Sequence, residues 1–142
     1  MFVKEIMTKS VISILPDASL KQVGRILKEK RISGLPVVDN NANIIGIVTL
    51  TDMLKILGQI YQSRLEKKET PESELSQIYE QEKLKAKVSD IMTKNVFTLE
   101  ENDTVEDVMK LMFSKGIHTI PVVIDGKVIG IMGKRDLVYA CF

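Results

Sequence analysis

Several residue types that mark common protein classes are scarce in this chain of 142 residues. It has no tryptophan, and aromatic residues make up 5% of it, so exposed platforms for stacking nucleic-acid bases are poorly supplied. Its one cysteine, Cys141, excludes an intramolecular disulfide and fits a reducing compartment. Its one histidine belongs to no Cys/His cluster with metal-ligand spacing, so we expect no metal site.

Net charge and long apolar runs are also lacking. The 20 Lys and Arg residues against 19 Asp and Glu leave a formal charge of +1, which favours neither nucleic acid nor an anionic membrane. No run approaches the roughly 20 apolar residues of a membrane span, and the opening "MFVKEIMTKS" does not resemble a signal peptide. We therefore expect a cytoplasmic protein with no membrane segment, and nucleic acid is an unlikely partner.

Sequence phrases typical of enzymes are missing as well. The chain has no P-loop, no G-x-G-x-x-G phrase and no nucleophile elbow. Its single histidine and single cysteine lie far apart in sequence. We expect no catalytic residues, and the protein is predicted not to be an enzyme.

The clearest positive feature is an internal repeat. At an offset of 85, residues 3–39 align with residues 88–124 with 12 identities in 37 positions. "VKEIMTKSV" falls on "VSDIMTKNV", and "PVV" falls on "PVV". The offset then falls by one residue to 84, and "GIVTLTD" (46–52) aligns with "GIMGKRD" (130–136). The second copy keeps the glycine and the aspartate but has neither threonine. An internal repeat predicts two copies of one supersecondary unit.

Each copy predicts the element order β-α-β-β-α. A short extended piece precedes a capping box and apolar residues at helical spacing; a proline-led strand, a turn, a second strand and a second helix follow. About 55 residues are too few to bury a good core alone, so we expect an α+β (α/β) fold of two repeats packed with pseudo-two-fold symmetry. In order, the expected elements are extended pieces at 11–14 and 96–99, helices from Ser19 and Thr104, strands at 35–38, 44–48, 120–123 and 128–132, and second helices entered at Asp52 and Asp136.

The segment between the copies predicts a charged helical connector. Residues 56–87 hold six Lys and Arg against six Glu, with a break at Pro71 before a second helix to about Leu84. A solvated connector is the simpler interpretation, and a helix that contacts a partner or a second copy is the alternative. The expected division is a first domain at 1–57, a connector at 58–87 and a second domain at 88–142.

Taken together, "IMT", "ISGLPVVD", "IHTIPVVI" and the phrase ending in Asp52 resemble a stand-alone pair of cystathionine-β-synthase (CBS) domains, the tandem called a Bateman module. The resemblance implies a regulatory module with two clefts that bind AMP, ADP, ATP or S-adenosylmethionine, with no required cofactor. It also implies a disc-like homodimer that signals to a regulated protein, which the sequence does not identify. A structural pair with one or both clefts empty, or a pair that binds nucleic acid, remains the alternative.

The resemblance also assigns roles to residues. The closing aspartates, Asp52 and Asp136, are expected on the ribose hydroxyls, and Thr49 on a phosphate, although both aspartates also suit a helix N-terminus. His118, Lys134 and Arg135 are implied to reach the phosphates of a nucleotide across the pseudo-two-fold axis. A solvated surface position is the alternative for each. The remaining candidates are residues around the adenine or next to the named groups: Val11, Ile12, Ser13, Ser33, Gly34, Pro36, Thr51, Val96, Phe97, Thr98, Thr119, Ile120 and Pro121. The first copy has all three polar residues of the phrase, Thr49, Thr51 and Asp52, which predicts that the cleft at Asp52 is the better nucleotide site.

Overall fold

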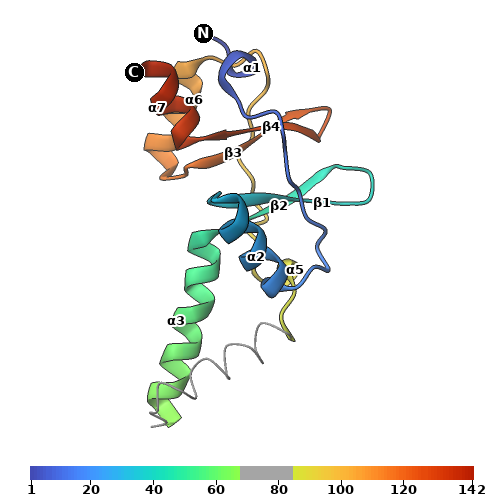
Figure 1. The fold of residues 1–142 in the computed structure, drawn as a ribbon, viewed down its shortest axis with the longest axis vertical. Helices are drawn as coiled ribbons and strands as arrows, with labels where there is room; N and C mark the ends of the chain where they lie inside the picture. Colours follow the sequence, from blue (N-terminus) through green and yellow to red (C-terminus); the bar gives the residue numbers. More distant parts are fainter. Residues whose placement is uncertain (68–84) are drawn as a thin grey trace.

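The computed structural model describes residues 1–67 and 85–142. Two small units lie one above the other, each with a two-stranded antiparallel hairpin and helices on the hairpin's outer side (Figure 1). The elements in chain order are α1 (Val3–Ile6), α2 (Leu20–Lys30), β1 (Gly34–Val38), β2 (Ile44–Thr49), α3 (Leu50–Lys67), α5 (Val88–Ile91), α6 (Val105–Lys115), β3 (Thr119–Ile124), β4 (Lys127–Gly133) and α7 (Lys134–Cys141).

The α+β fold of two similar units is confirmed, with two corrections to the elements. The predicted order omitted the short helices α1 and α5, which open the repeats. The extended pieces expected at 11–14 and 96–99 shrink to one bridging residue each. The N–H of Ile14 donates to the carbonyl of Pro36 at 3.0 Å, and the N–H of Val38 donates back to Ile14 at 2.9 Å. Leu99 makes the equivalent parallel bridge to Val122. Only the last residue of each piece lies beside a strand, because the piece before it crosses from one unit to the other.

Both expected capping boxes are present. The N–H of Gln22 donates to Ser19 Oγ at 3.1 Å, and the N–H of Ser19 donates to Gln22 Oε1 at 3.1 Å. Thr104 and Asp107 repeat the arrangement at the start of α6. The backbone N–H and then the hydroxyl of Thr104 hold the pKa of the Asp107 carboxyl below its usual range. These local hydrogen bonds explain why α2 and α6 begin where the sequence predicts.

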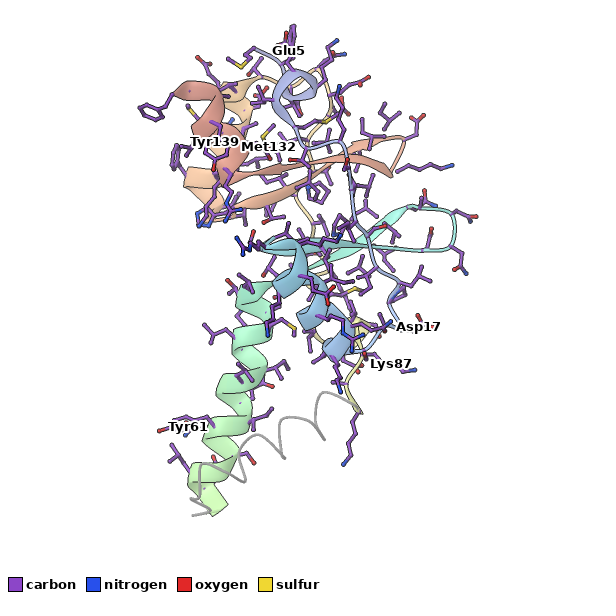
Figure 2. All side chains as sticks on the ribbon, in the orientation of Figure 1. Glu5, Asp17, Tyr61, Lys87, Met132 and Tyr139 are labelled. Atoms are coloured by element: carbon purple, nitrogen blue, oxygen red, sulfur yellow. The ribbon has the colours of Figure 1, made fainter. Side chains whose placement is uncertain are left out.

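The opening segment of each repeat packs on the other repeat. Val3 has no exposed surface and belongs to the core of the second unit, while Val88 is equally buried in the core of the first. Helix α1 accordingly lies with α6 and α7, and α5 lies with α2 (Figure 1). The side chain of Met132, part of the same core as Val3, points into the upper unit (Figure 2). Two cores that each borrow a segment cannot be separated at the boundary between the repeats.

The exchanged segments also supply an extra bridge to each hairpin. Thr8 exchanges two backbone hydrogen bonds, both of 2.9 Å, with Ile131, and Thr93 does the same with Ile47 at 2.8 and 2.9 Å. The preceding methionines lie on the glycines of the repeated phrase. A β-carbon at Gly46 would come within 2.5 Å of the sulfur of Met92, and one at Gly130 within 2.5 Å of the sulfur of Met7. The glycine of "GIVTLTD" is therefore the place where the other repeat's methionine packs.

Helix α3 is longer than the first repeat requires. It begins at Leu50 and continues to Lys67, so the domain boundary expected at 57 falls inside a continuous helix. The second connector helix, expected from Pro71 to about Leu84, lies outside the described residues. Among the helices that the structure describes, none is both long enough and apolar enough to cross a membrane.

The contact between Met92 and Gly46 leads to a stability prediction. We expect Gly46→Ala to lower the free energy of unfolding by about 1–3 kcal/mol, because the new methyl group overlaps the methionine sulfur and approaches the carbonyl oxygen of Thr93. The matched control is Gly58→Ala in α3, where the new methyl group meets nothing within 4 Å and we expect a gain of about 0.5–1 kcal/mol. Thermal and urea unfolding of both variants measure the difference. A Gly46 variant as stable as the Gly58 variant would contradict the packing described for Met92.

Candidate functional site

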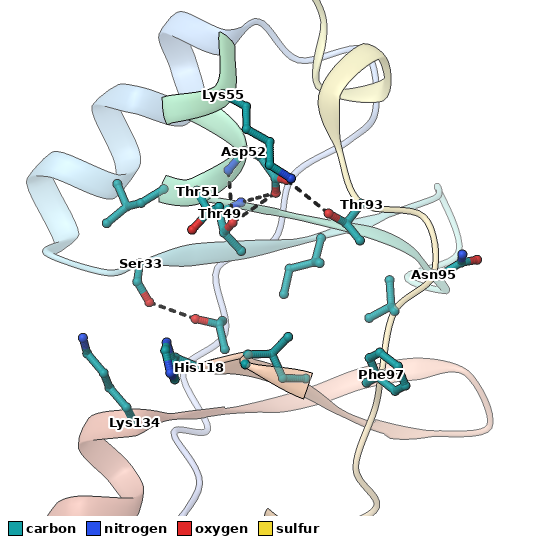
Figure 3. Close-up of a pocket in the computed structure, with 16 residues that line it drawn as sticks. Ser33, Thr49, Thr51, Asp52, Lys55, Thr93, Asn95, Phe97, His118 and Lys134 are labelled. Carbon is teal, nitrogen blue, oxygen red and sulfur yellow. Dashed lines mark hydrogen bonds between the residues drawn. The ribbon is translucent and has the colours of Figure 1, made fainter. Parts of the chain in front are cut away.

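Two clefts lie between the facing hairpins. One, of about 380 Å³, contains Asp52, and the other, of about 860 Å³, contains Asp136. Ser33 and Thr119 line both clefts, and their hydroxyl oxygens lie 2.8 Å apart in a hydrogen bond between the two hairpins (Figure 3). This hydrogen bond marks the place where the Asp52 cleft and the Asp136 cleft meet.

In the Asp52 cleft, the carboxylate is held on both oxygens. Oδ2 accepts the N–H of Thr49 at 2.8 Å and the hydroxyl of the same residue at 3.1 Å. Oδ1 accepts the hydroxyl of Thr93 at 3.1 Å (Figure 3). Asp52 is 7% exposed. The Thr49 hydroxyl donates to this carboxylate and accepts the N–H of Asp52 at 3.3 Å, so it serves as a helix cap in this structure.

The carboxylate of Asp136 makes two of the same hydrogen bonds in the other repeat. Its Oδ2 accepts the N–H of Gly133 at 2.8 Å, and its Oδ1 accepts the hydroxyl of Thr8 at 2.9 Å. Gly133 provides no side chain to cap α7. The two aspartates are therefore equivalent in geometry, and the difference between the repeats lies in the residues around them.

Thr8 and Thr93 are site residues that the sequence reasoning did not include. Each belongs to an "IMT" phrase, lines one cleft and donates to the aspartate of the opposite repeat. The signal was present, because "IMT" was among the identities of the repeat. Sequence alone did not reveal that the phrase packs on the other copy.

The change from Thr49 to Gly133 is compensated across the hairpin. Thr49 faces Gly34 in the first sheet, and Gly133 faces Thr119 in the second, so each pair holds one threonine and one glycine in opposite order. A β-carbon at Gly34 would lie 3.1 Å from Thr49 Cγ2 and 3.3 Å from Thr119 Cγ2. The small residue at 34 lets both threonines gather at the junction of the clefts.

The structure brings most of the expected site residues to the two clefts. Both clefts draw on both repeats, as the resemblance implies. The Asp52 cleft contains Ser33, Thr49, Thr51, Val96, Phe97, His118, Thr119 and Lys134, and the Asp136 cleft contains Val11, Ile12, Ser33, Gly34, Thr119, Lys134 and Arg135. Five candidates line neither cleft: Ser13 and Thr98 are exposed, and Pro36, Ile120 and Pro121 are buried in the strands.

The basic residues are divided unequally. Lys55, Lys134 and the imidazole of His118 line the Asp52 cleft. Arg135 lines the Asp136 cleft alone, so the structure does not bring it to the neighbouring cleft, whereas Lys134 lines both. The carbonyl of His118 accepts the N–H of Lys134 at 3.1 Å, which fixes the start of α7 against β3. Among the described residues, no group of three or more His, Cys, Asp or Glu is placed to hold a metal ion.

Comparison with known proteins identifies the fold. A profile of the CBS domain matches residues 3–59 and 88–142. The chain belongs to the CBS domain family. Both matched stretches end within or at the last helix of a repeat, and each contains one of the two cleft aspartates, so the clefts of this CBS pair are built entirely from family sequence.

Relatives of this CBS pair include stand-alone proteins and parts of larger ones. Uncharacterized protein MJ1426 of Methanocaldococcus jannaschii is 33% identical, over 99% of this chain and 90% of its own length. The inosine-5′-monophosphate dehydrogenase of the same organism is 31% identical over 94% of this chain, which spans only 22% of that enzyme. The chloroplastic protein CBSX2 of Arabidopsis thaliana is 30% identical over 89% of this chain and 57% of its own length.

Two similar solved structures contain adenosine derivatives. The CBS domain pair of protein MJ0100, in complex with 5′-methylthioadenosine and S-adenosylmethionine, has a TM-score of 0.78 and 28% identity, covering 99% of this chain and 95% of that one. CBSX2 in complex with AMP has a TM-score of 0.74 and 28% identity, with the same coverage.

The hydrogen bond from Thr93 to Asp52 predicts a positioning role. We expect Thr93→Val to reduce stability by about 1 kcal/mol, because one carboxylate oxygen loses a donor in a partly buried place. Thr98→Val is the matched control, since Thr98 is exposed and lines neither cleft. A double-mutant cycle of Thr93→Val with Asp52→Asn measures the coupling by urea unfolding. Additive effects of the two substitutions would refute the role assigned to Thr93.

Proposed function

We propose that this CBS pair is a regulatory binding module that takes adenosine-containing ligands, AMP, ADP, ATP or S-adenosylmethionine, in the clefts between its repeats. The observation that carries the proposal is a carboxylate that occurs in both repeats, Asp52 and Asp136. Each is fixed by hydrogen bonds in the first turn of a helix and lines a cleft formed by both repeats. The adenosine derivatives named for the MJ0100 pair and CBSX2 support the ligand class.

The chemistry of the Asp136 cleft suits the three parts of a nucleotide. Oδ2 of Asp136 is committed to backbone, while Oδ1 accepts one hydroxyl and keeps a free lone pair for a ribose hydroxyl. The apolar side chains of Val11 and Ile12 offer a surface for the base. Lys134 and Arg135 begin the helix beside the carboxylate, where an anionic phosphate is favoured by charge and by the free N–H groups of the first turn.

The sequence favoured the Asp52 cleft as the better nucleotide site, and the volumes and lining of the clefts support the opposite preference. The Asp136 cleft has more than twice the volume of the Asp52 cleft, and Arg135 belongs to it alone. The hydroxyl of Thr49, which the sequence suggested for a phosphate, donates to Asp52 instead. We propose the Asp136 cleft as the principal ligand site and the Asp52 cleft as a smaller second site.

The module is proposed to act by binding rather than by catalysis. A ligand in either cleft touches side chains of both repeats, so a ligand that prefers one arrangement of the repeats shifts the module towards it. A regulated protein would recognise that arrangement. A cytoplasmic location and the identity of the regulated protein stay predictions.

Removing the ribose carboxylate tests the adenosine-binding proposal. We expect wild-type protein to bind AMP, ADP or ATP, and we expect Asp136→Asn to weaken the stronger site about tenfold or more, because a charged acceptor for the ribose hydroxyls is lost. Isothermal titration measures both. Asp125→Asn is the matched control, since Asp125 is exposed in the β3–β4 turn and its left-handed backbone, with φ 49°, suits asparagine. Absence of binding heat with AMP, ADP, ATP and S-adenosylmethionine alike would refute the proposed function.

The homodimer expected from the resemblance has a candidate surface. Large apolar side chains are exposed on two helices, Leu54 (67%) and Tyr61 (56%) on α3 and Tyr139 (76%) on α7. Tyr61 and Tyr139 project on the same side of the molecule in Figure 2. We propose that this α3–α7 face packs against a second copy, because exposed aromatic side chains on one side of a molecule are typical of such contacts.

Sedimentation velocity tests the α3–α7 face. We expect the wild-type protein to sediment as a dimer and Leu54→Glu to sediment as a monomer, since a buried carboxylate opposes the contact. Ile124→Glu is the control, because Ile124 is exposed at the hairpin end of β3, away from that face. A dimer that survives Leu54→Glu would show that the copies associate through another surface.

A further inference from the structure

The Asp136 cleft concentrates positive charge in a way that its counterpart does not. Its cations come from the end of α2 and the start of α7, and Asp136 is the one carboxylate among the described residues that line it. The five cations are Lys28, Lys30, Arg31, Lys134 and Arg135. The equivalent positions of the other repeat hold Phe113, Lys115, Gly116, Leu50 and Thr51. Four of these five cations have no basic residue at the equivalent position of the other repeat, in a chain whose total charge is +1.

Arg31 stands out because its backbone disfavours a side chain. It ends α2 in the left-handed region, with φ 53° and ψ 44°, where glycine is the usual residue. The second repeat has that glycine: Gly116 ends α6 with φ 65° and ψ 30°. The first repeat thus carries an arginine at a position where a β-carbon is unfavourable, and Arg31 is one of the residues that line the Asp136 cleft.

A second arginine is tied to the same place. Arg135 Nη1 donates to the carbonyl oxygen of Arg31 at 3.4 Å, which joins the start of α7 to the end of α2. Two guanidinium-bearing residues are thereby held at one end of the cleft. The carboxylate of Asp136 already accepts from Thr8 and from Gly133. Several cations held at one end of a cleft beside a single described carboxylate leave an excess of positive charge, which favours the binding of a multivalent anion.

We propose that Arg31 is a specificity-determining residue which, together with Arg135, makes the Asp136 cleft selective for adenosine ligands that carry two or more phosphates. This specificity rests on the adenosine-binding function proposed above. The ribose binds at Asp136, and the phosphate chain extends between the C-terminal end of α2 and the start of α7. There the guanidinium groups of the two arginines bind pairs of phosphate oxygens. A cationic sulfonium ligand is disfavoured in the same cleft. The Asp52 cleft, which has Gly116 and Thr51 at the equivalent positions, has no such preference.

Replacing Arg31 with the residue of the other repeat tests this assignment. Arg31→Gly, Arg31→Lys and the control Arg25→Ala are titrated with AMP, ADP, ATP and 5′-methylthioadenosine at one ionic strength; Arg25 is exposed on the same helix and lines neither cleft. For wild-type protein we expect ATP and ADP to bind at least about tenfold more tightly than AMP or 5′-methylthioadenosine. We expect Arg31→Gly to lower the affinity for ATP by about tenfold or more, and the affinity for 5′-methylthioadenosine by less than about twofold. Arg31→Lys restores part of the ATP affinity, and Arg25→Ala changes none of the affinities.

Thermal unfolding separates a binding role from a structural one. The Arg31→Gly protein is expected to melt at or above the wild-type temperature, because glycine suits the left-handed position. Loss of ATP affinity with unchanged stability supports the proposal. Equal losses for ATP and 5′-methylthioadenosine, an unchanged ATP affinity, or a wild-type preference for AMP would overturn it while leaving adenosine binding intact. Absence of binding by all four ligands would overturn this specificity, and absence of S-adenosylmethionine binding as well would refute the proposed function.

Discussion

One repeated hydrogen bond connects the folding of this protein to its clefts. The threonine of each "IMT" segment crosses to the other repeat and donates to the aspartate in the first turn of that repeat's last helix, Thr8 to Asp136 and Thr93 to Asp52. The crossing places the valine of each segment in the opposite core and the methionine on the opposite glycine. A unit of this size gains a complete core only by including the borrowed segment. The two repeats are therefore one cooperative structure rather than two linked domains.

The same hydrogen bond removes the conflict between two interpretations of the aspartates. A helix-capping role and a ligand-binding role looked like alternatives in the sequence, but the carboxylate has an oxygen for each. Oδ2 accepts the backbone N–H three residues earlier, which fixes the helix, and Oδ1 faces the threonine at the cleft. Since the threonine comes from the other repeat, a ligand at Oδ1 would sense how the two repeats sit against each other. Under the proposed function, the stability of the fold and the binding of a ligand depend on the same carboxylate.

Local chemistry made much of the fold predictable, and nonlocal packing made the rest unpredictable. Capping boxes, proline-led strands and turns depend on neighbours in sequence, so Ser19 and Thr104 marked their helices correctly. The packing of each opening segment on the other repeat could not be predicted from the sequence, because two identical "IMT" phrases fit either repeat equally well. The loss of the threonine at Gly133 looked like the loss of a hydroxyl, and only the strand register revealed Thr119 opposite it. Similarly, Arg31 gave no signal in the sequence, because its left-handed backbone and its place in a cleft exist only in the folded chain.

The two clefts depart from the symmetry of the repeat in the residues that line them. A strict repeat would form two equal clefts, and such a module would respond to one ligand only by degree. Here the C-terminal end of α2 and the start of α7 give the Asp136 cleft its cations. Lys134 lines both clefts, as do Ser33 and Thr119, which hydrogen-bond to each other. A phosphate that engages Lys134 from one side would remove its charge from the other side. Because opposite charges attract strongly in partly enclosed clefts, the occupancy of one cleft would alter the affinity of the other without any large movement of the fold. Under the proposed function, two unequal clefts that share Lys134 would couple the binding of one ligand to the binding of another.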